Sequence, residues 1–168
     1  MITQSRLKEM LEYDPETGLF TRKISCGYRG CHRAGEIVGS IRADGYVIIR
    51  IDGVSYYAHR LAWFYVHGVW PEFDTDHIDL KTSNNRIVNL RPATRSENKQ
   101  NRVAAQKNNI NTGILGVHFI NRSGLKNKYA AKIKINGKQK SLGYYSTPEL
   151  AHAAYVLAKR ELHPYGTL

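Results

Sequence analysis

Hydrophobic spacing in the first 71 residues predicts two helices with a strand pair between them. Three apolar residues near the N-terminus share one helical face: Leu7, Met10 and Leu11. Residues 45–60 read as two strands around the hairpin signal Asp52-Gly53. Residues 59–68 again have helical spacing, and we expect Trp70-Pro71 to end that helix.

Residues 72–107 predict a strand, a polar loop, a second strand and a helix. "TDHID" and "NLRPA" read as the two short strands. Thr94 and Glu97 have the spacing of a capping box, which places the start of a helix near Thr94. We expect that helix to run through "TRSENKQNRVAAQ".

Residues 108–168 predict three strands and a closing helix, after a polar linker at 104–113. The strands are "GVHFINR", "KYAAKIKING" and "KQKSLGYYS", with a hairpin turn at Asn136-Gly137. The middle strand alternates apolar residues with Ala130, Lys132 and Lys134, which predicts one apolar and one cationic face. Thr147-Pro148 begins the helix, and three apolar residues are expected to face the sheet: Leu150, Ala154 and Leu157.

These elements predict an α+β fold in three parts. Residues 1–71 form an N-terminal strand and helix region packed on a central strand-strand-helix core at 72–107. Residues 108–168 form a small three-stranded antiparallel sheet packed on one helix.

Composition narrows the class of protein. The 42% hydrophobic content fits a globular chain rather than a disordered one. The sequence lacks an apolar run long enough to span a membrane and lacks the apolar core of a signal peptide. Two cysteines make no disulfide framework. We therefore expect a soluble cytoplasmic protein of a bacterial or phage-infected cell, without membrane contact.

Charge is unevenly distributed along the chain. Residues 1–75 carry nine Lys or Arg and nine Asp or Glu, whereas residues 108–168 carry nine and two. This asymmetry favours a polyanionic partner for the C-terminal part. A generally basic, solvated surface is the alternative.

The stretch "DHIDLKTSNNRIVNL" contains most of the candidate catalytic and metal-binding residues of the chain. Asp76 offers a hard oxygen ligand, and His77 a base that works near pH 7. Asn98, early in the predicted helix, offers a second hard ligand. Phosphodiester cleavage needs these functions: an activated water, charge neutralisation and help for the departing oxygen. A solvated surface loop is the alternative.

"DHIDLKTSNNRIVNLRPATRSENKQN" resembles the HNH homing endonucleases, the phage-type branch of the ββα-metal nucleases. The resemblance implies that His77 is the general base, that Asp76 and Asn98 bind one Mg²⁺ or Mn²⁺, and that the amide of Asn89 holds His77 in position across the loop. Asn85 is a second candidate for that bracing. Arg95 is implied to approach the phosphate.

Two further motifs leave alternatives open. His59, in "AHRLAW", could contact DNA or the site, or could be a packing residue that supports the site. "CGYRGCH", at 26–32, invites a zinc interpretation, but its C-x₄-C spacing and the lack of further cysteines disfavour that.

The C-terminal part resembles the ethylene-response-factor (Apetala-type) DNA-binding domain. The resemblance rests on the stretches "GV" at 116–117, "YAAKI", "GKQKSLGYYST" and "ELAHAAYVLA". In that fold a three-stranded sheet enters the major groove. The implied DNA contacts on this chain are His118, Arg122, Lys126, Lys128, Lys132, Lys134, Lys138 and Lys140.

Taken together, these features predict a monomeric, metal-dependent endonuclease that hydrolyses double-stranded DNA at a chosen site. Two alternatives remain. The first is a catalytically silent DNA-binding or regulatory protein with a relic nuclease domain. The second is an RNA-binding protein of ribosomal type, which charge alone suggests and which leaves the Asp-His-Asn spacing unexplained.

Overall fold

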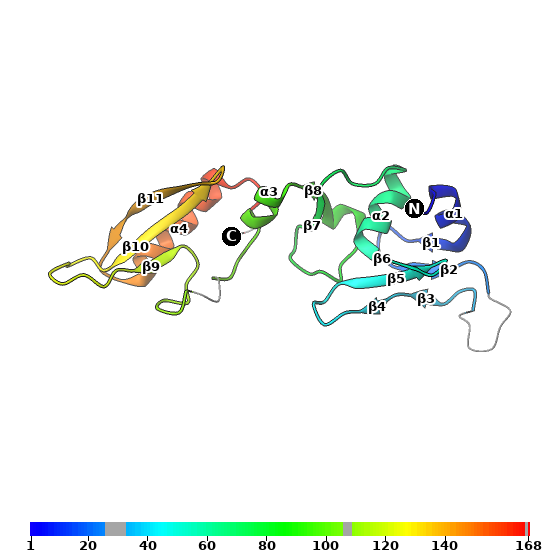
Figure 1. Ribbon diagram of the computed structural model, residues 1–168, viewed down its shortest axis with the longest axis horizontal. Helices are drawn as coiled ribbons and strands as arrows, with labels where there is room; N and C mark the ends of the chain where they lie inside the picture. The colour runs from blue at the N-terminus through cyan, green and yellow to red at the C-terminus, as the bar shows by residue number, and fades with distance from the viewer. Residues whose placement is uncertain (26–32, 106–108, 167) are drawn as a thin grey trace. The chain divides into compact units, whose positions relative to one another are not determined.

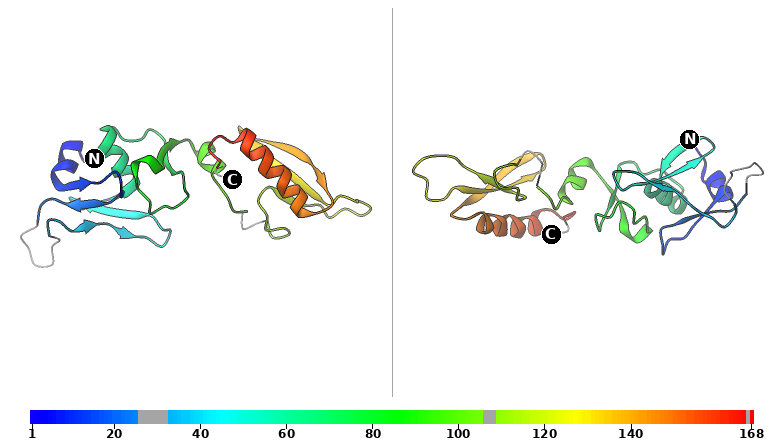
Figure 2. Two further views of the ribbon diagram at one scale, coloured as in Figure 1. Left: turned by 180° about the vertical axis from the view of Figure 1, so that it is seen from behind. Right: turned by 90° about the horizontal axis from the view of Figure 1, so that it is seen from below.

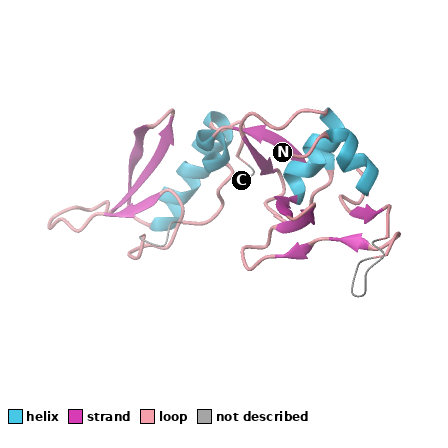
Figure 3. Ribbon diagram, turned by 45° about the vertical axis from the view of Figure 1, so that its right-hand side comes forward, coloured by secondary structure: helices cyan, strands magenta, loops and turns pink. Residues whose placement is uncertain are grey.

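The chain forms two compact units, Met1–Ala93 and Thr94–Leu168, in a computed structural model that describes residues 1–25, 33–105, 109–166 and 168. Both units mix helices with small antiparallel sheets, so the expected α+β class is confirmed (Figures 1 and 3). The boundary falls inside the expected central segment, and the three-part domain assignment stays a prediction. "CGYRGCH" lies outside the described residues, as do residues 106–108 of the expected linker.

The first unit is built from short strands around two helices. The helices are α1 (Gln4–Met10) and α2 (Ala58–His67), with a 3₁₀ turn, η1, at Ile87–Asn89. The strands are β1 (Leu11–Tyr13), β2 (Phe20–Arg22), β3 (Ile37–Val38), β4 (Ser40–Ile41), β5 (Val47–Ile51), β6 (Val54–Tyr57), β7 (Asp74–His77) and β8 (Leu90–Ala93). They form the sheets β1-β2-β3, β4-β5-β6 and β7-β8, all with antiparallel pairing.

One apolar cluster holds this unit together. Its fully buried members come from α1, β1, β2, β5 and α2, and include Leu7, Leu11, Phe20, Ile49 and Leu61. Leu90 of β8 belongs to the same cluster. The strand pair β7-β8 is therefore anchored on the core that the N-terminal residues build.

Local signals placed these elements with small errors at their ends. The Asp52-Gly53 turn is confirmed, because both residues have positive φ, at 48° and 82°. Leu11 begins β1 rather than completing the first helix. The expected stop at Trp70-Pro71 was wrong, since Gly68 ends α2 in the left-handed conformation with its N–H on the carbonyl of Phe64.

The second unit contains α3 (Arg95–Gln100), β9 (Val117–Phe119), β10 (Tyr129–Ile135), β11 (Lys138–Tyr145) and α4 (Pro148–Leu162). The three strands form one antiparallel sheet in the order β11-β10-β9, and α4 lies along one face of it (Figure 2). The expected sheet on one helix is thus observed. The capping box at Thr94 and Glu97 is also observed, but α3 ends at Gln100, well short of the expected end.

The face that α4 turns to the sheet agrees with the expected one at Ala154, which packs against the apolar cluster, and differs from it at the two leucines. Its buried residues are Ala151, Tyr155 and Lys159, whereas Leu150 and Leu157 are 53% and 67% exposed. Tyr155 lies against Gly116, where an added Cβ would stand 2.1 Å from the tyrosine ring. The ring packs directly on the glycine backbone, and we infer that this contact sets the rotation of the helix.

Within the described part of the chain, every helix is too short or too polar to cross a membrane.

Candidate nuclease site

Strand β7 delivers the Asp-His pair into the interior of the first unit. Asp76 pairs with Arg91 across the β7-β8 ladder, and His77 pairs with Leu90. Asp76 and His77 are only 6% and 3% exposed. Because neighbours on a strand point to opposite faces, each side chain enters its own surroundings.

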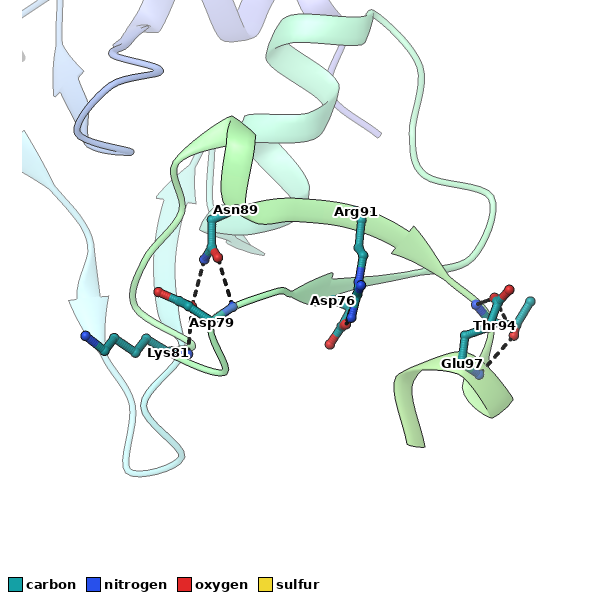
Figure 4. Close-up of polar contacts among 7 residues, drawn as sticks. All are labelled: Asp76, Asp79, Lys81, Asn89, Arg91, Thr94 and Glu97. Atoms are coloured by element: carbon teal, nitrogen blue, oxygen red, sulfur yellow. Dashed lines mark hydrogen bonds and ion pairs between the residues drawn. The ribbon is translucent and has the colours of Figure 1, made fainter. Parts of the chain in front are cut away.

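The loop that follows β7 is braced by Asn89, at the end of η1. The backbone N–H of Asp79 donates to Oδ1 of Asn89 at 3.0 Å, and Nδ2 of Asn89 donates to Oδ1 of Asp79 (Figure 4). Nδ2 of Asn89 also donates to the carbonyl of Asn84. Cross-loop hydrogen bonds of this amide were expected and are present, but they join Asn89 to Asp79 and Asn84, and its role in holding His77 stays a prediction. They explain why a segment without ladder hydrogen bonds is rich in asparagine. The catalytic importance of Asn89 stays a prediction.

Asn85, the second bracing candidate, contacts the histidine directly. Nε2 of His77 lies 3.3 Å from Oδ1 of Asn85, and Nδ2 of Asn85 donates to the carbonyl of Ser83. Since the amide nitrogen is engaged by Ser83, the amide oxygen faces the ring. With Oδ1 of Asn85 as the acceptor, the proton of neutral His77 is at Nε2 and its lone pair is at Nδ1.

A group of aromatic rings encloses His77 on another side. The ring centroid of His59, the second residue of α2, lies 5.1 Å from that of His77 in an edge-to-face arrangement of 73°. Tyr46 lies 5.3 Å from His59 and 5.9 Å from His77. His59 is 6% exposed, and its Nδ1 is buried without a hydrogen-bond partner among the described residues.

Burial makes both histidines weak bases. It lowers the pKa of His59 to about 3, and the nearby His77 and Arg60 act in the same direction. Burial also lowers the pKa of His77, although Asn85, Asp79 and Asp76 oppose that shift. Both rings are therefore neutral at pH 7, the form in which an imidazole can accept a proton.

Asp76 has a cationic partner that the sequence interpretation missed. Nε and Nη2 of Arg91 lie 3.0 Å and 2.8 Å from Oδ2 of Asp76 (Figure 4). A carboxylate with so little exposure needs such compensation. The two residues face each other across the ladder, so the pairing becomes visible once the strand register is known.

The expected metal ligands lie in different units: Asp76 in the first and Asn98, on α3, in the second. A carboxylate and an amide oxygen suit a hard cation such as Mg²⁺. Among the described residues there is no group of three His, Cys, Asp or Glu that could hold a metal. Binding of a cation by Asp76 and Asn98 stays a prediction.

Residues of the N-terminal part, far away in sequence, pack against the loop that follows β7. The hydroxyl of Tyr13 donates to the carbonyl of Asn85 at 2.7 Å. Gly18 and Gly45 approach the loop so closely that a Cβ would stand 2.4 Å from the nitrogen of Arg86 and 2.6 Å from the hydroxyl of Thr82, respectively. The N-terminal residues thus form one side of the site.

In the second unit, the strand register divides the expected DNA contacts between two faces of the sheet. His118 is opposite Ala130, Lys132 opposite Ser141 and Lys134 opposite Gln139, and we call this side the polar face. Lys138 and Lys140 instead pair with Ile135 and Ile133, on the other face. Four further candidates lie outside the sheet and are exposed: Arg95, Arg122, Lys126 and Lys128.

A cavity of about 660 Å³ lies beside the polar face, within the second unit. Lys132 and Lys134 line it together with Lys99 of α3 and Arg102, and none of the described lining residues is Asp or Glu. Lys99 and Arg102 were not among the expected contacts. Only folding brings these four cations to one cavity.

Comparison with known proteins bears on the first unit and the start of the second. Residues 56–100 match the family model described as HNH endonuclease, which covers less than half of the chain. The match supports an HNH nuclease segment that contains Asp76, His77, Asn89 and Asn98. It begins near β6 and so includes His59. No curated protein matches the chain, and no solved structure does. The comparisons give the ethylene-response-factor resemblance no support.

Proposed function

We propose that this chain is a site-directed, metal-dependent DNA endonuclease of the homing type. The observation that carries the proposal is His77. It is a neutral, buried imidazole that contacts Asn85, inside the segment that matches the HNH endonuclease model.

In the proposed reaction, Nδ1 of His77 takes the proton from the water that attacks the phosphorus atom. Asn85 keeps the proton of the resting ring at Nε2, so the lone pair is at Nδ1. Asn89 keeps the loop closed behind the ring. The resemblance implies products with 3′-hydroxyl and 5′-phosphate ends.

Asp76 and Asn98 would hold one Mg²⁺ or Mn²⁺. When bound, the cation would supply charge neutralisation on the phosphate and stabilise the departing oxygen. Arg91 holds Asp76 through Oδ2, which fixes the direction of this carboxylate on β7.

The second unit is proposed to bind double-stranded DNA and to choose the site. Support comes from its charge, from its three-stranded sheet on one helix, and from the acid-free cavity beside the polar face. A compact nuclease site needs no sequence preference of its own, and a tethered module could supply it.

The test is cleavage of a supercoiled plasmid library that carries random inserts, with nick positions read by sequencing. Wild-type protein should cut in Mg²⁺ and not in excess EDTA. His77→Ala should lower the rate at least about 100-fold, the usual contribution of a general base. His67→Ala, at an exposed histidine of α2, is the matched control and should cut normally.

Two outcomes would contradict the proposal. A cleavage rate of His77→Ala equal to that of the wild type would show that His77 is not the general base. Tight DNA binding by the wild type without cleavage in any divalent metal would support the catalytically silent alternative.

A further inference from the structure

We propose that His59 is a positioning residue for His77: its ring, together with Tyr46, fixes the plane of the imidazole that Asn85 orients. The inference rests on the proposed function, in which His77 is the base. It extends the site to two residues that are 18 and 31 positions before His77 in the sequence.

A hydrogen bond alone does not fix an imidazole plane. The contact from Nε2 of His77 to Asn85 is 3.3 Å long, and rotation about the Cβ–Cγ bond of a histidine has a broad minimum. A contact on the ring itself restricts this rotation and so helps to keep Nδ1 pointing in one direction.

His59 supplies that contact. Its ring meets the ring of His77 at 73° with centroids 5.1 Å apart, an edge-to-face geometry that aromatic rings prefer. Tyr46 touches both rings, and Tyr57 lies 5.4 Å from His59. His59 is therefore held in place by Tyr46 and Tyr57. We call His59 and Tyr46 the clamp on His77, because both side chains are rigid planar rings that resist movement of the imidazole.

His59 acts through its shape rather than through charge or a hydrogen bond. Its buried Nδ1 has no partner among the described residues, and its low pKa keeps the ring uncharged at neutral pH. A planar ring without nitrogen should therefore do the same work, whereas a flexible apolar side chain of similar size should not.

The experiment compares His59→Phe, which keeps a planar ring, with His59→Leu, which fills the space without one. Cleavage of a mapped target at saturating DNA gives kcat, and single-turnover rates over a range of protein concentrations give the apparent affinity. His59→Leu should lower kcat about 5- to 10-fold with affinity within about 2-fold, as expected from losing one aromatic contact. His59→Phe should stay within about 2-fold of the wild type in both.

NMR of the histidine side chains reports the orientation and tautomer of the His77 ring without a cleavage assay. In the wild type and in His59→Phe, the ring of His77 should give one sharp set of signals with the proton on Nε2. In His59→Leu those signals should broaden or average between tautomers. Failure of the wild type to cut DNA would sink the proposed function and leave this measurement intact.

The positioning role is overturned by any of three results: unchanged kcat and sharp His77 signals in His59→Leu, a loss in affinity alone, or an equal loss in His59→Phe. Circular dichroism confirms the fold of each variant. If His59→Leu does not fold, Tyr46→Leu removes the other ring of the clamp and is judged by the same readouts.

Discussion

His59 and His77 come from different elements, and burial changes the acid-base behaviour of both in the same direction. The Asp-His-Asn spacing made His77, Asn89 and Asn98 recognisable in the sequence. Nothing local indicated Tyr46 or Arg91, because each reaches the site only through strand pairing and packing. The role of His59 stayed open in the sequence, because the residues around it do not show which side chains the start of α2 packs against.

At this scale the protein should lose stability in mild acid. The pKa of His59 is about 3 in the folded protein and 6.5 for an unperturbed histidine. Between these pH values the unfolded chain therefore binds a proton that the folded chain does not bind. The contribution is absent above pH 6.5 and grows as pH falls towards 3. From pH 7.5 to pH 5, it should cost roughly 2 kcal/mol.

Urea unfolding at several pH values checks this expectation. In His59→Phe the titrating group is gone, so the acid-induced loss should shrink by about that amount. His67→Phe, the same substitution at an exposed histidine of α2, is the control. Identical pH profiles for wild type and His59→Phe would contradict it.

Elements were predictable where their signals are local. The turns at Asp52-Gly53 and Asn136-Gly137 have the expected positive φ values, and the Thr94 capping box begins α3. The rotation of α4 was not predictable, because the contact that sets it joins Tyr155 to Gly116, far apart in sequence. Leu150 and Leu157 carry the apolar pattern but face outward.

Two glycines with the same φ angle isolate this contact. Gly116 and Gly124 both have φ of 78°, but a Cβ meets Tyr155 at Gly116 and nothing within 4 Å at Gly124. Gly124→Ala should cost about 1 kcal/mol, from backbone strain alone. Gly116→Ala adds a steric clash and should cost about 2–4 kcal/mol.

Thermal unfolding of the two variants, followed through the transition of the second unit, gives the difference. Equal destabilisation would show that Tyr155 can move aside, and that this contact does not set the rotation of α4.

For the whole molecule, the sequence showed where the excess cations are but not how they are arranged. The C-terminal charge is as expected, yet the register separates Lys132 and Lys134 from Lys138 and Lys140. Folding also adds Lys99 and Arg102 to the cavity beside the polar face. Face and cavity depend on non-local pairing, which alternation in a single strand could not reveal.

This arrangement predicts unequal roles for two lysine pairs. Lys132→Ala/Lys134→Ala and Lys138→Ala/Lys140→Ala remove the same formal charge, so distant attraction to DNA falls equally. If the polar face carries the phosphate contacts, the first double variant should lower the slope of log affinity against log salt by roughly 1–2. The second should change it by less than about 0.5.

Fluorescence anisotropy with labelled duplex DNA over a salt series makes the comparison. Equal slopes for both double variants, or a larger loss for Lys138→Ala/Lys140→Ala, would remove the polar face as the binding surface.

The contacts of Tyr13, Gly18 and Gly45 with the loop after β7 have a consequence for engineering. The strand-loop-strand stretch is not a portable cassette. A chimaera that contains only residues 72–107 within another protein lacks the N-terminal residues that this loop packs against. A graft that preserves catalytic geometry must bring the amino-terminal scaffold along, with both glycines unaltered.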